Sequence, residues 1–275
     1  MPNGNGKTRR GLVLADFMNL VLEPKLGPGH RNAFDAKAQL YADALGLQWT
    51  CQFSDELAVE LERERLHFLD SVTDDEEYWQ LVNAAATAKF VDLSDAERRR
   101  IGSEIHSGII SDSSLYEVRP DMFQALRRLK KYCEKNGLLL ALASNQPKNH
   151  LSRMVQEFNL GALFDKQYSF QSVGGARKPA LSFWRSIRDL TGLPILAMVG
   201  HSLQNDAPGA ILDFPVFLHD RTGQTVVRLA LPQADTRLSD WVYTRIRMRL
   251  LSTHLTPADL IEAAVMHLKK KLKPA

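Results

Sequence analysis

The side chains best suited to chemistry in this chain are polar groups that directly follow short apolar runs. Asp16 follows the run 11–15, Ser144 and Asn145 follow the run 138–143, and His201, Ser202 and Asp206 come after the run 195–200. A carboxylate in such a place can act as a nucleophile, a base or a metal ligand. Lys178, which stands between the second and third groups, would add a cation to them.

Apolar runs of this length are typical of parallel strands that helices cover on both faces. A fourth run, 215–219, follows the other three, and amphipathic stretches such as 121–131 separate them. This alternation predicts an α/β fold with a doubly wound parallel sheet. Because the carboxyl ends of parallel strands meet at one edge of such a sheet, we expect the polar groups to gather there.

Residues 23–119 have a different pattern, with almost only helical signals. Helices are expected over 33–45, from Ser54 as an N-cap, from Thr73, and from Ser94, where Ser94 and Glu97 have capping-box spacing. These signals predict one helical cap, inserted into a core made of residues 1–22 and 120–221.

The remaining residues, 222–275, are predicted to form a C-terminal extension. We expect an edge strand over 225–231, a helix over 238–251 and a final helix capped by Thr256. Apolar positions at helical spacing must be buried, so the extension should pack on the core or form a homodimer interface. The lysines of 269–273 are interpreted as a solvated helix end.

Composition excludes several classes of protein. The formal net charge is +3 from 35 basic and 32 acidic residues, which does not favour a nucleic-acid partner. Two cysteines, Cys51 and Cys133, lack the spacing of a zinc site or a disulfide framework. We find no signal peptide and no apolar stretch of roughly 20 residues, so we expect a cytoplasmic protein that does not enter membranes.

The order of these residues resembles the haloacid dehalogenase-like (HAD) superfamily over residues 11–221. Phe164-Asp165, Arg177-Lys178-Pro179 and 205–210 carry the resemblance most clearly. It implies a Rossmannoid core with a helical cap and a small anionic substrate. In that case Asp16 would be the nucleophile, Ser144 would hydrogen-bond the transferred group, and Lys178 would hold both in their charged forms, with Asn145 and Ser202 as further substrate-binding residues.

The resemblance also implies a magnesium ion, bound by Asp16, the main-chain oxygen of Met18 and Asp206. Three positions depart from the family pattern: Met18 replaces a proton-transferring Asp, Leu20 replaces Thr, and His201 replaces a carboxylate. A histidine nitrogen suits transition metals better than magnesium. Magnesium, a transition metal bound through His201, and no metal therefore stay open.

Two classes of function stay open as well. The first is a hydrolase with an altered active site that attacks a small phosphorylated or halogenated compound with Asp16. The dehalogenating branch of the family also lacks the second Asp and needs no metal, so Met18 and His201 argue against it less strongly, but its Thr is missing at Leu20 too and the sequence offers no match for its cap arginine. The second is a catalytically silent member that acts as a binding or regulatory module.

Overall fold

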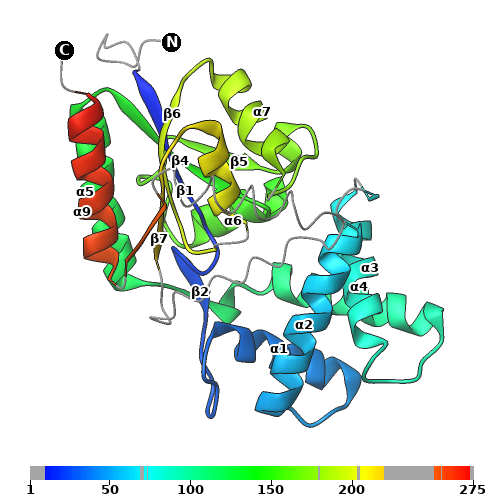
Figure 1. Ribbon diagram of the computed structural model, residues 1–275. Coiled ribbons are helices and arrows are strands. Elements are labelled where there is room, and N and C mark those ends of the chain that lie inside the picture. Colours follow the sequence, from blue (N-terminus) through cyan, green and yellow to red (C-terminus); the bar gives the residue numbers. More distant parts are fainter. Residues whose placement is uncertain are drawn as a thin grey trace. The chain divides into compact units, whose positions relative to one another are not determined.

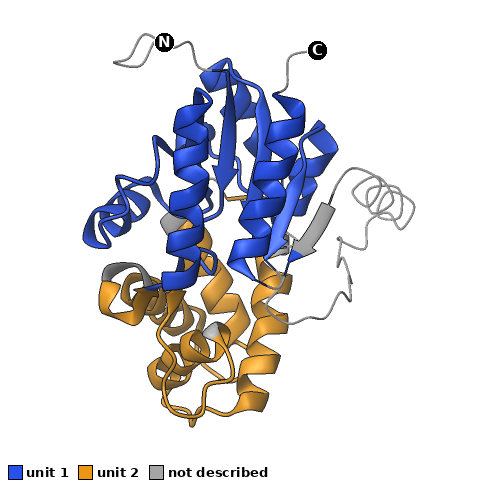
Figure 2. Cartoon of the chain, turned by 90° about the vertical axis from the view of Figure 1, so that its left-hand side faces the viewer, with its two compact units in different colours: residues 1–22, 118–275 blue, residues 23–117 orange. Residues whose placement is uncertain are grey.

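The computed structural model describes residues 10–68, 71–72, 74–178, 180–202, 205–219, 251–254 and 256–272. These residues form two compact units, shown in different colours in Figure 2. The core unit comprises residues 1–22 and 118–275, and the helical unit comprises residues 23–117. The chain leaves the core unit through β2 (Leu22–Pro24) and returns through β3 (Tyr116–Val118), and these two strands pair as a small sheet.

The core unit is built on a six-stranded sheet with the order β5-β4-β1-β6-β7-β8. Its strands are β1 (Gly11–Ala15), β4 (Leu138–Ser144), β5 (Lys166–Ser169), β6 (Ile195–Gly200), β7 (Val216–His219) and β8 (Leu251–His254). Every neighbouring pair is parallel. All five residues of β1 are buried, as expected for a central strand covered on both faces. The predicted α/β fold with a parallel sheet is confirmed.

Helices cover the two faces of this sheet (Figure 1). α5 (Pro120–Lys135) and α9 (Pro257–Lys271) lie side by side on one face, and α7 (Leu181–Thr191) lies on the other. α6 (Lys148–Glu157) connects β4 to β5. Two short 3-10 helices, η2 (Gln171–Val173) and η3 (Ala207–Leu212), lie in the loops. α7 buries Phe183, Trp184 and Ile187 in the same apolar cluster as the strand residues Leu12 and Leu14, which fixes it against the sheet.

The final helix has the predicted cap, since the Thr256 hydroxyl accepts a hydrogen bond from the Asp259 main-chain N–H at 3.1 Å. α9 then buries Leu260, Ile261, Ala264 and Leu268. The predicted strand at 225–231 and residues 238–250 of the predicted helix lie outside the described residues. Leu251 was wrongly placed in that helix, because it begins β8 and pairs with Val216 of β7. The homodimer through these helices stays a prediction.

The edge strand β5 (Lys166–Ser169) is short and ends at Ser169. The chain turns after Ser169 because the Ser169 hydroxyl accepts a hydrogen bond from the Ser172 main-chain N–H at 3.1 Å. Such a local side-chain bond competes with strand pairing.

The helical unit contains α1 (Ala33–Leu45), α2 (Cys51–Phe68), α3 (Asp75–Thr87), α4 (Asp95–Ser111) and the 3-10 helix η1 (Ser113–Leu115). Gly46 ends α1 in the left-handed conformation with a φ of 65°. Ser94 and Glu97 form the expected capping box at the start of α4. The helices enclose a separate apolar cluster that includes Tyr41, Leu57 and Val82.

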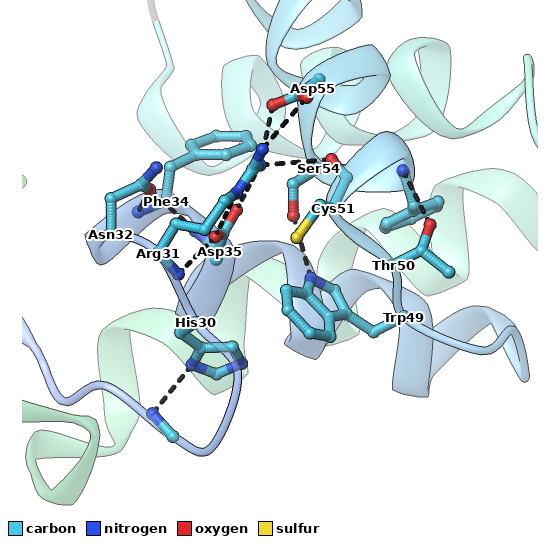
Figure 3. Close-up of polar contacts among 12 residues, drawn as sticks. His30, Arg31, Asn32, Phe34, Asp35, Trp49, Thr50, Cys51, Ser54 and Asp55 are labelled. Carbon is cyan, nitrogen blue, oxygen red and sulfur yellow. Dashed lines mark hydrogen bonds and ion pairs between the residues drawn. The ribbon is translucent and has the colours of Figure 1, made fainter.

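Ser54 is not an N-cap, contrary to the prediction. α2 begins three residues earlier, where Thr50 Oγ1 accepts a hydrogen bond from the Phe53 main-chain N–H at 3.0 Å (Figure 3). Ser54 is buried inside the helix, and its hydroxyl accepts a bond from Trp49 Nε1 at 2.9 Å. A tertiary contact therefore uses the hydroxyl that the sequence pattern assigned to a cap.

An arginine-carboxylate network joins the beginning of α1 to α2 (Figure 3). Arg31 donates to both oxygens of Asp35, at 2.9 and 3.0 Å, and to Asp55 Oδ1 at 2.8 Å. Chiefly through the hydrogen bonds from Arg31, the pKa of the buried Asp35 carboxyl falls to about 2.

Among the described residues, no helix combines the length and apolar character that a membrane span requires.

Candidate active site

Asp16 follows the central strand β1 directly, and its main-chain N–H continues the ladder by donating to the Val199 carbonyl at 2.9 Å. In the strand order, β1 lies between β4 and β6. The side chain is almost completely buried, with 5% of the residue exposed. A carboxylate held there needs charged or hydrogen-bonding partners to remain ionised.

Lys178 is the first of these partners. Its ammonium donates to Asp16 Oδ1 at 2.6 Å, to Asp206 Oδ1 at 2.8 Å and to the Ala143 carbonyl at 3.1 Å. All three donors of the ammonium are thereby used. The ring of Trp184 lies below it, with Nζ 5.8 Å from the ring centroid. The lysine thus joins the ends of β1, β4 and β6 at one point.

His201 is the second partner of Asp16. Its Nδ1 lies 2.7 Å from Asp16 Oδ2, and its Nε2 lies 3.4 Å from the side-chain amide of Asn19. The contact with Asp16 has the distance of an ion pair, and with the proton on Nδ1 the Nε2 atom can accept a hydrogen bond from Asn19. The ring is three-quarters buried, with 24% of its side chain exposed.

Asp206 is fully buried and is held by main-chain donors. Its Oδ2 accepts hydrogen bonds from the main-chain N–H groups of His201 at 3.1 Å and Ser202 at 3.0 Å. Gly200 makes this approach feasible, because a Cβ at that position would collide with the Asp206 carboxylate. The loop after β6 is therefore shaped around this acid.

These contacts set the protonation states of the site. Burial alone would raise the pKa of the Asp16 carboxyl, but the Lys178 charge and the His201 ring outweigh burial and lower that pKa below its usual range. Burial opposes the charge of Lys178 too, yet the two carboxylates raise the pKa of its ammonium. Burial and the neighbouring charge of Asp16 raise the pKa of Asp206. Near neutral pH, Asp16 and Lys178 are accordingly a charged pair.

The other predicted substrate-binding residues lie nearby but make different contacts. Ser144 is buried, and its hydroxyl accepts a hydrogen bond from the Gln146 main-chain N–H at 3.2 Å. Asn145 bonds the main chain of Lys178 in both directions, at 2.9 and 2.7 Å, and so fixes the lysine backbone. Ser202 contributes its main-chain N–H to Asp206. The roles of Ser144, Asn145 and Ser202 toward a substrate stay predictions.

Met18 and Leu20 follow Asp16 closely, at positions where the sequence is predicted to depart from the motif it resembles. Both side chains are buried, Met18 with 8% of the residue exposed and Leu20 with none. Neither can donate or accept a proton in catalysis. Asn19 stands between them with a φ of 60°, and this conformation, which asparagine tolerates better than most residues, accompanies its contact with His201.

The side chains that could hold a metal ion here are those of Asp16, His201 and Asp206, each of which offers one ligand atom within 4.8 Å of the others. The main-chain oxygen of Met18 as a further ligand stays a prediction. Each carboxylate oxygen already faces a donor: both Oδ1 atoms face Lys178, Asp16 Oδ2 faces His201, and Asp206 Oδ2 faces main-chain N–H groups. Magnesium prefers an octahedral set of oxygens. The donor set, with one nitrogen and an ammonium bridging the carboxylates, does not suit magnesium.

Sequence reasoning missed two residues of this site. Asn19 contacts His201 through a left-handed backbone conformation that could not be predicted from the sequence. An asparagine in a loop after a strand is only a weak signal of such a conformation. Gly200 was read only as the end of a strand, whereas its missing side chain makes room for Asp206.

Comparisons with known proteins agree with this architecture. A family model described as haloacid dehalogenase-like hydrolase matches residues 12–212. Among curated proteins, none matches the chain in sequence.

Three solved structures illustrate the structural similarity. L-2-haloacid dehalogenase from Xanthobacter autotrophicus has a TM-score of 0.58 and 14% identity, covering 92% of this chain and 97% of that one. A predicted phosphoglycolate phosphatase from Haemophilus somnus has a TM-score of 0.55 and 15% identity, covering 94% and 99%. The magnesium-bound HAD-hydrolase YfnB from Bacillus subtilis has a TM-score of 0.58 and 11% identity, covering 80% and 93%. At these identities, the likeness concerns the fold alone.

Proposed function

Because the chain belongs to the haloacid dehalogenase-like hydrolase family, we propose that it is a metal-independent hydrolase whose Asp16 displaces a halide from a small anionic compound. The observation that carries this proposal is the position of Asp16 between Lys178 and His201, 2.6 and 2.7 Å from one carboxylate oxygen each. Lys178 and His201 together provide hydrogen-bond donors and positive charge beside the Asp16 carboxylate, a role that a metal ion plays in metal-dependent hydrolases.

The first step is a displacement by the Asp16 carboxylate. One of its oxygens attacks the carbon that bears the halogen, the new C–O bond forms as the carbon–halogen bond breaks, and the halide leaves with the bonding electron pair. Each Asp16 oxygen keeps a second lone pair beside its contact with Lys178 or His201. The lowered pKa of Asp16 keeps it in the reactive anionic form near neutral pH.

The second step is hydrolysis of the resulting aspartyl ester. Water adds to the carbonyl carbon of Asp16, and the C–O bond to the product alcohol breaks, which regenerates the carboxylate. His201 is suited to take the proton of the attacking water and to return it to the departing alcohol oxygen. To accept that proton, Nε2 would have to leave its 3.4 Å contact with the Asn19 amide, because a neutral imidazole has a single acceptor nitrogen.

Met18 favours a halide over a phosphate monoester as substrate. An alkoxide leaving group requires a proton, which the family's second aspartate would provide and which Met18 cannot. A halide departs as a stable anion and requires none. The absence of a need for magnesium also favours a halide. The donor set around Asp16 does not suit that ion, and the displacement of a halide does not depend on it.

The experiment is a turnover assay with short 2-halocarboxylic acids and aryl phosphates, each measured in a metal chelator and with added Mg²⁺ or Zn²⁺. We expect halide release that the chelator does not inhibit and that Asp16→Asn abolishes. His201→Asn should slow ester hydrolysis, so that the covalent adduct accumulates and mass spectrometry detects it. His67→Asn, a change of an exposed histidine on α2, is the matched control.

A second candidate function is a catalytically silent binding or regulatory module. The observation that favours it is the buried apolar character of Met18 and Leu20, neither of which can transfer a proton. Saturable binding of small anions by isothermal titration calorimetry, with no turnover of any compound in the panel, would support this function instead.

A further inference from the structure

The two units of the chain carry opposite charge. Residues 23–117 hold 19 of the 32 acidic side chains and 9 of the 35 lysines and arginines, a formal balance of −10. The remaining residues hold 13 acidic and 26 basic side chains, a balance of +13. The small net charge of the whole chain therefore conceals two strongly charged surfaces. Electrostatic association with a partner depends on such local fields rather than on the total.

Four of the basic side chains of the core unit line one groove. This groove, of about 850 Å³, runs between α5 and the segment that follows α6. It is lined by Arg127, Arg128, Lys130, Lys131 and one acid, Glu134, on one side and by Asn159 and Leu163 on the other. The volume is large for a single phosphate and suits an extended or bulky anionic group.

Most of these cations have no carboxylate partner within the part of the chain that the structure describes. Lys130 is paired, with Asp165 at 2.7 Å and Glu134 at 3.4 Å. Arg127, Arg128 and Lys131 are exposed and form no ion pair with any described residue. Arg127 only lies over the ring of Phe123, 6.0 Å from its centroid. Three exposed cations close together on α5 thus repel each other and favour an anionic neighbour.

The sequence of the helical unit contains a run of residues of the opposite charge. Residues 74–77 are Asp-Asp-Glu-Glu at the beginning of α3, and no lysine or arginine occurs from residue 66 to residue 88. Acidic residues also begin α4, but three arginines, residues 98–100, follow them there. A helix N-terminus favours some negative charge. The run at 74–77 differs from the start of α4, because no lysine or arginine within more than twenty residues of sequence around it offsets its negative charge.

The charge distribution points to a second copy of this chain as the occupant of the groove: the acidic run 74–77 of one copy docks against Arg127, Arg128 and Lys131 of the other. We choose this partner because the groove and the run 74–77 have complementary charge. Every copy of the chain carries both. In a twofold dimer each copy gives one acidic run and one groove, so the contact occurs twice. This inference does not depend on the proposed function.

The test is sedimentation velocity of the full chain at about 0.1 M and 1 M salt, where the Debye length is about 10 and 3 Å. We expect a dimer at the lower salt concentration that dissociates at the higher one. Charge reversal of the groove (Arg127→Glu, Arg128→Glu, Lys131→Glu) should raise the dimer dissociation constant by at least about 100-fold. Reversal of the run (Asp75→Lys, Glu76→Lys, Glu77→Lys) should do the same, and it leaves the N-cap Asp74 in place.

Mixing the two reversed variants is the decisive arm. One variant then has an acidic groove and the other a basic run, so both contacts become complementary and a mixed dimer should form at low salt. A control variant with Lys148→Glu, Lys166→Glu and Arg185→Glu changes three exposed cations elsewhere on the core unit and should remain dimeric. Far-UV circular dichroism and melting temperature would establish that each variant is folded.

Several results would overturn the inference. These are a monomer at every salt concentration, a dimer that neither reversal weakens, or reversed variants that remain monomeric when mixed although folded. A monomer that binds a short single-stranded oligonucleotide through the groove, with binding lost in the groove variant, would identify a nucleic-acid site instead and would also overturn it.

Discussion

Replacing Lys178 with methionine should destabilise the protein strongly, because this change leaves two buried carboxylates without a counter-charge. Methionine approximates the volume of the lysine stem, so the main loss is the ammonium. The lysine side chain is 3% exposed, and those of Asp16 and Asp206 are 7% and 0% exposed. Water can therefore hydrate neither acid without opening the site.

The expected cost is about 3–5 kcal/mol near pH 7, the range for removing one partner of a buried ion pair. The cost should depend on pH. In the wild-type protein the pKa of Asp16 is lowered, so the stability it contributes is present above its unfolded pKa and is lost as pH falls. In the variant, burial and repulsion raise the carboxyl pKa values, so stability is lost as pH rises. Both effects make the deficit grow from about pH 4 upward.

The assay is urea unfolding followed by far-UV circular dichroism between pH 4 and 8. Combining Lys178→Met with Asp206→Asn should recover about 1–3 kcal/mol, because only one buried charge then lacks a partner. A loss below about 1 kcal/mol that does not change with pH would refute the reasoning, since the charges would then have to be hydrated or protonated in the wild-type protein as well.

Three further changes test other parts of the structure. Gly200→Ala should lower thermal stability by about 1–3 kcal/mol and impair any activity, because the new methyl group collides with Asp206; an unchanged melting curve would show that this loop adapts. Asp35→Asn should lower the melting temperature most above pH 3.8, with the difference vanishing as pH falls through about 2, because the lowered pKa of Asp35 contributes stability only where it is ionised; a deficit that persists at pH 2 would contradict this. Deleting residues 269–275 should leave the melting temperature unchanged, whereas deleting 256–275 should give insoluble protein, because Leu260, Ile261 and Leu268 are fully or almost fully buried; soluble, cooperatively unfolding protein from the longer deletion would be inconsistent with that burial.

Strands and helices with strong local patterns were predictable from the sequence. The runs that became β1, β4 and β6 are short, apolar and followed by polar residues, which only a covered parallel sheet explains easily. The start of α9 was equally clear, because Thr256 and Asp259 combine an N-cap with an acidic first turn. β8 was not predictable, because its sequence Leu-Ser-Thr-His has no strand pattern and its conformation depends on pairing with β7.

The candidate site was predictable only in part. The sequence predicted that four residues lie close together: Asp16, Lys178, His201 and Asp206. Three of them are near the end of a strand, and Lys178 belongs to the motif Arg177-Lys178-Pro179. The contacts between them could not be predicted, because the loops must be folded before the Lys178 ammonium can reach both Asp16 and Asp206. The contact of Asn19 with His201 likewise depends on a left-handed residue and a separation of 182 positions in the chain.

The most direct test of the central claim is turnover in oxygen-18 water, with a metal chelator present and the best substrate of the panel. If Asp16 forms an ester that water opens at its carbonyl carbon, the heavy oxygen enters the Asp16 carboxylate first, and mass spectrometry of the peptide containing Asp16 will detect it. Heavy oxygen found only in the released product, with the Asp16 peptide unlabelled after many turnovers, would contradict the claim that Asp16 is the nucleophile.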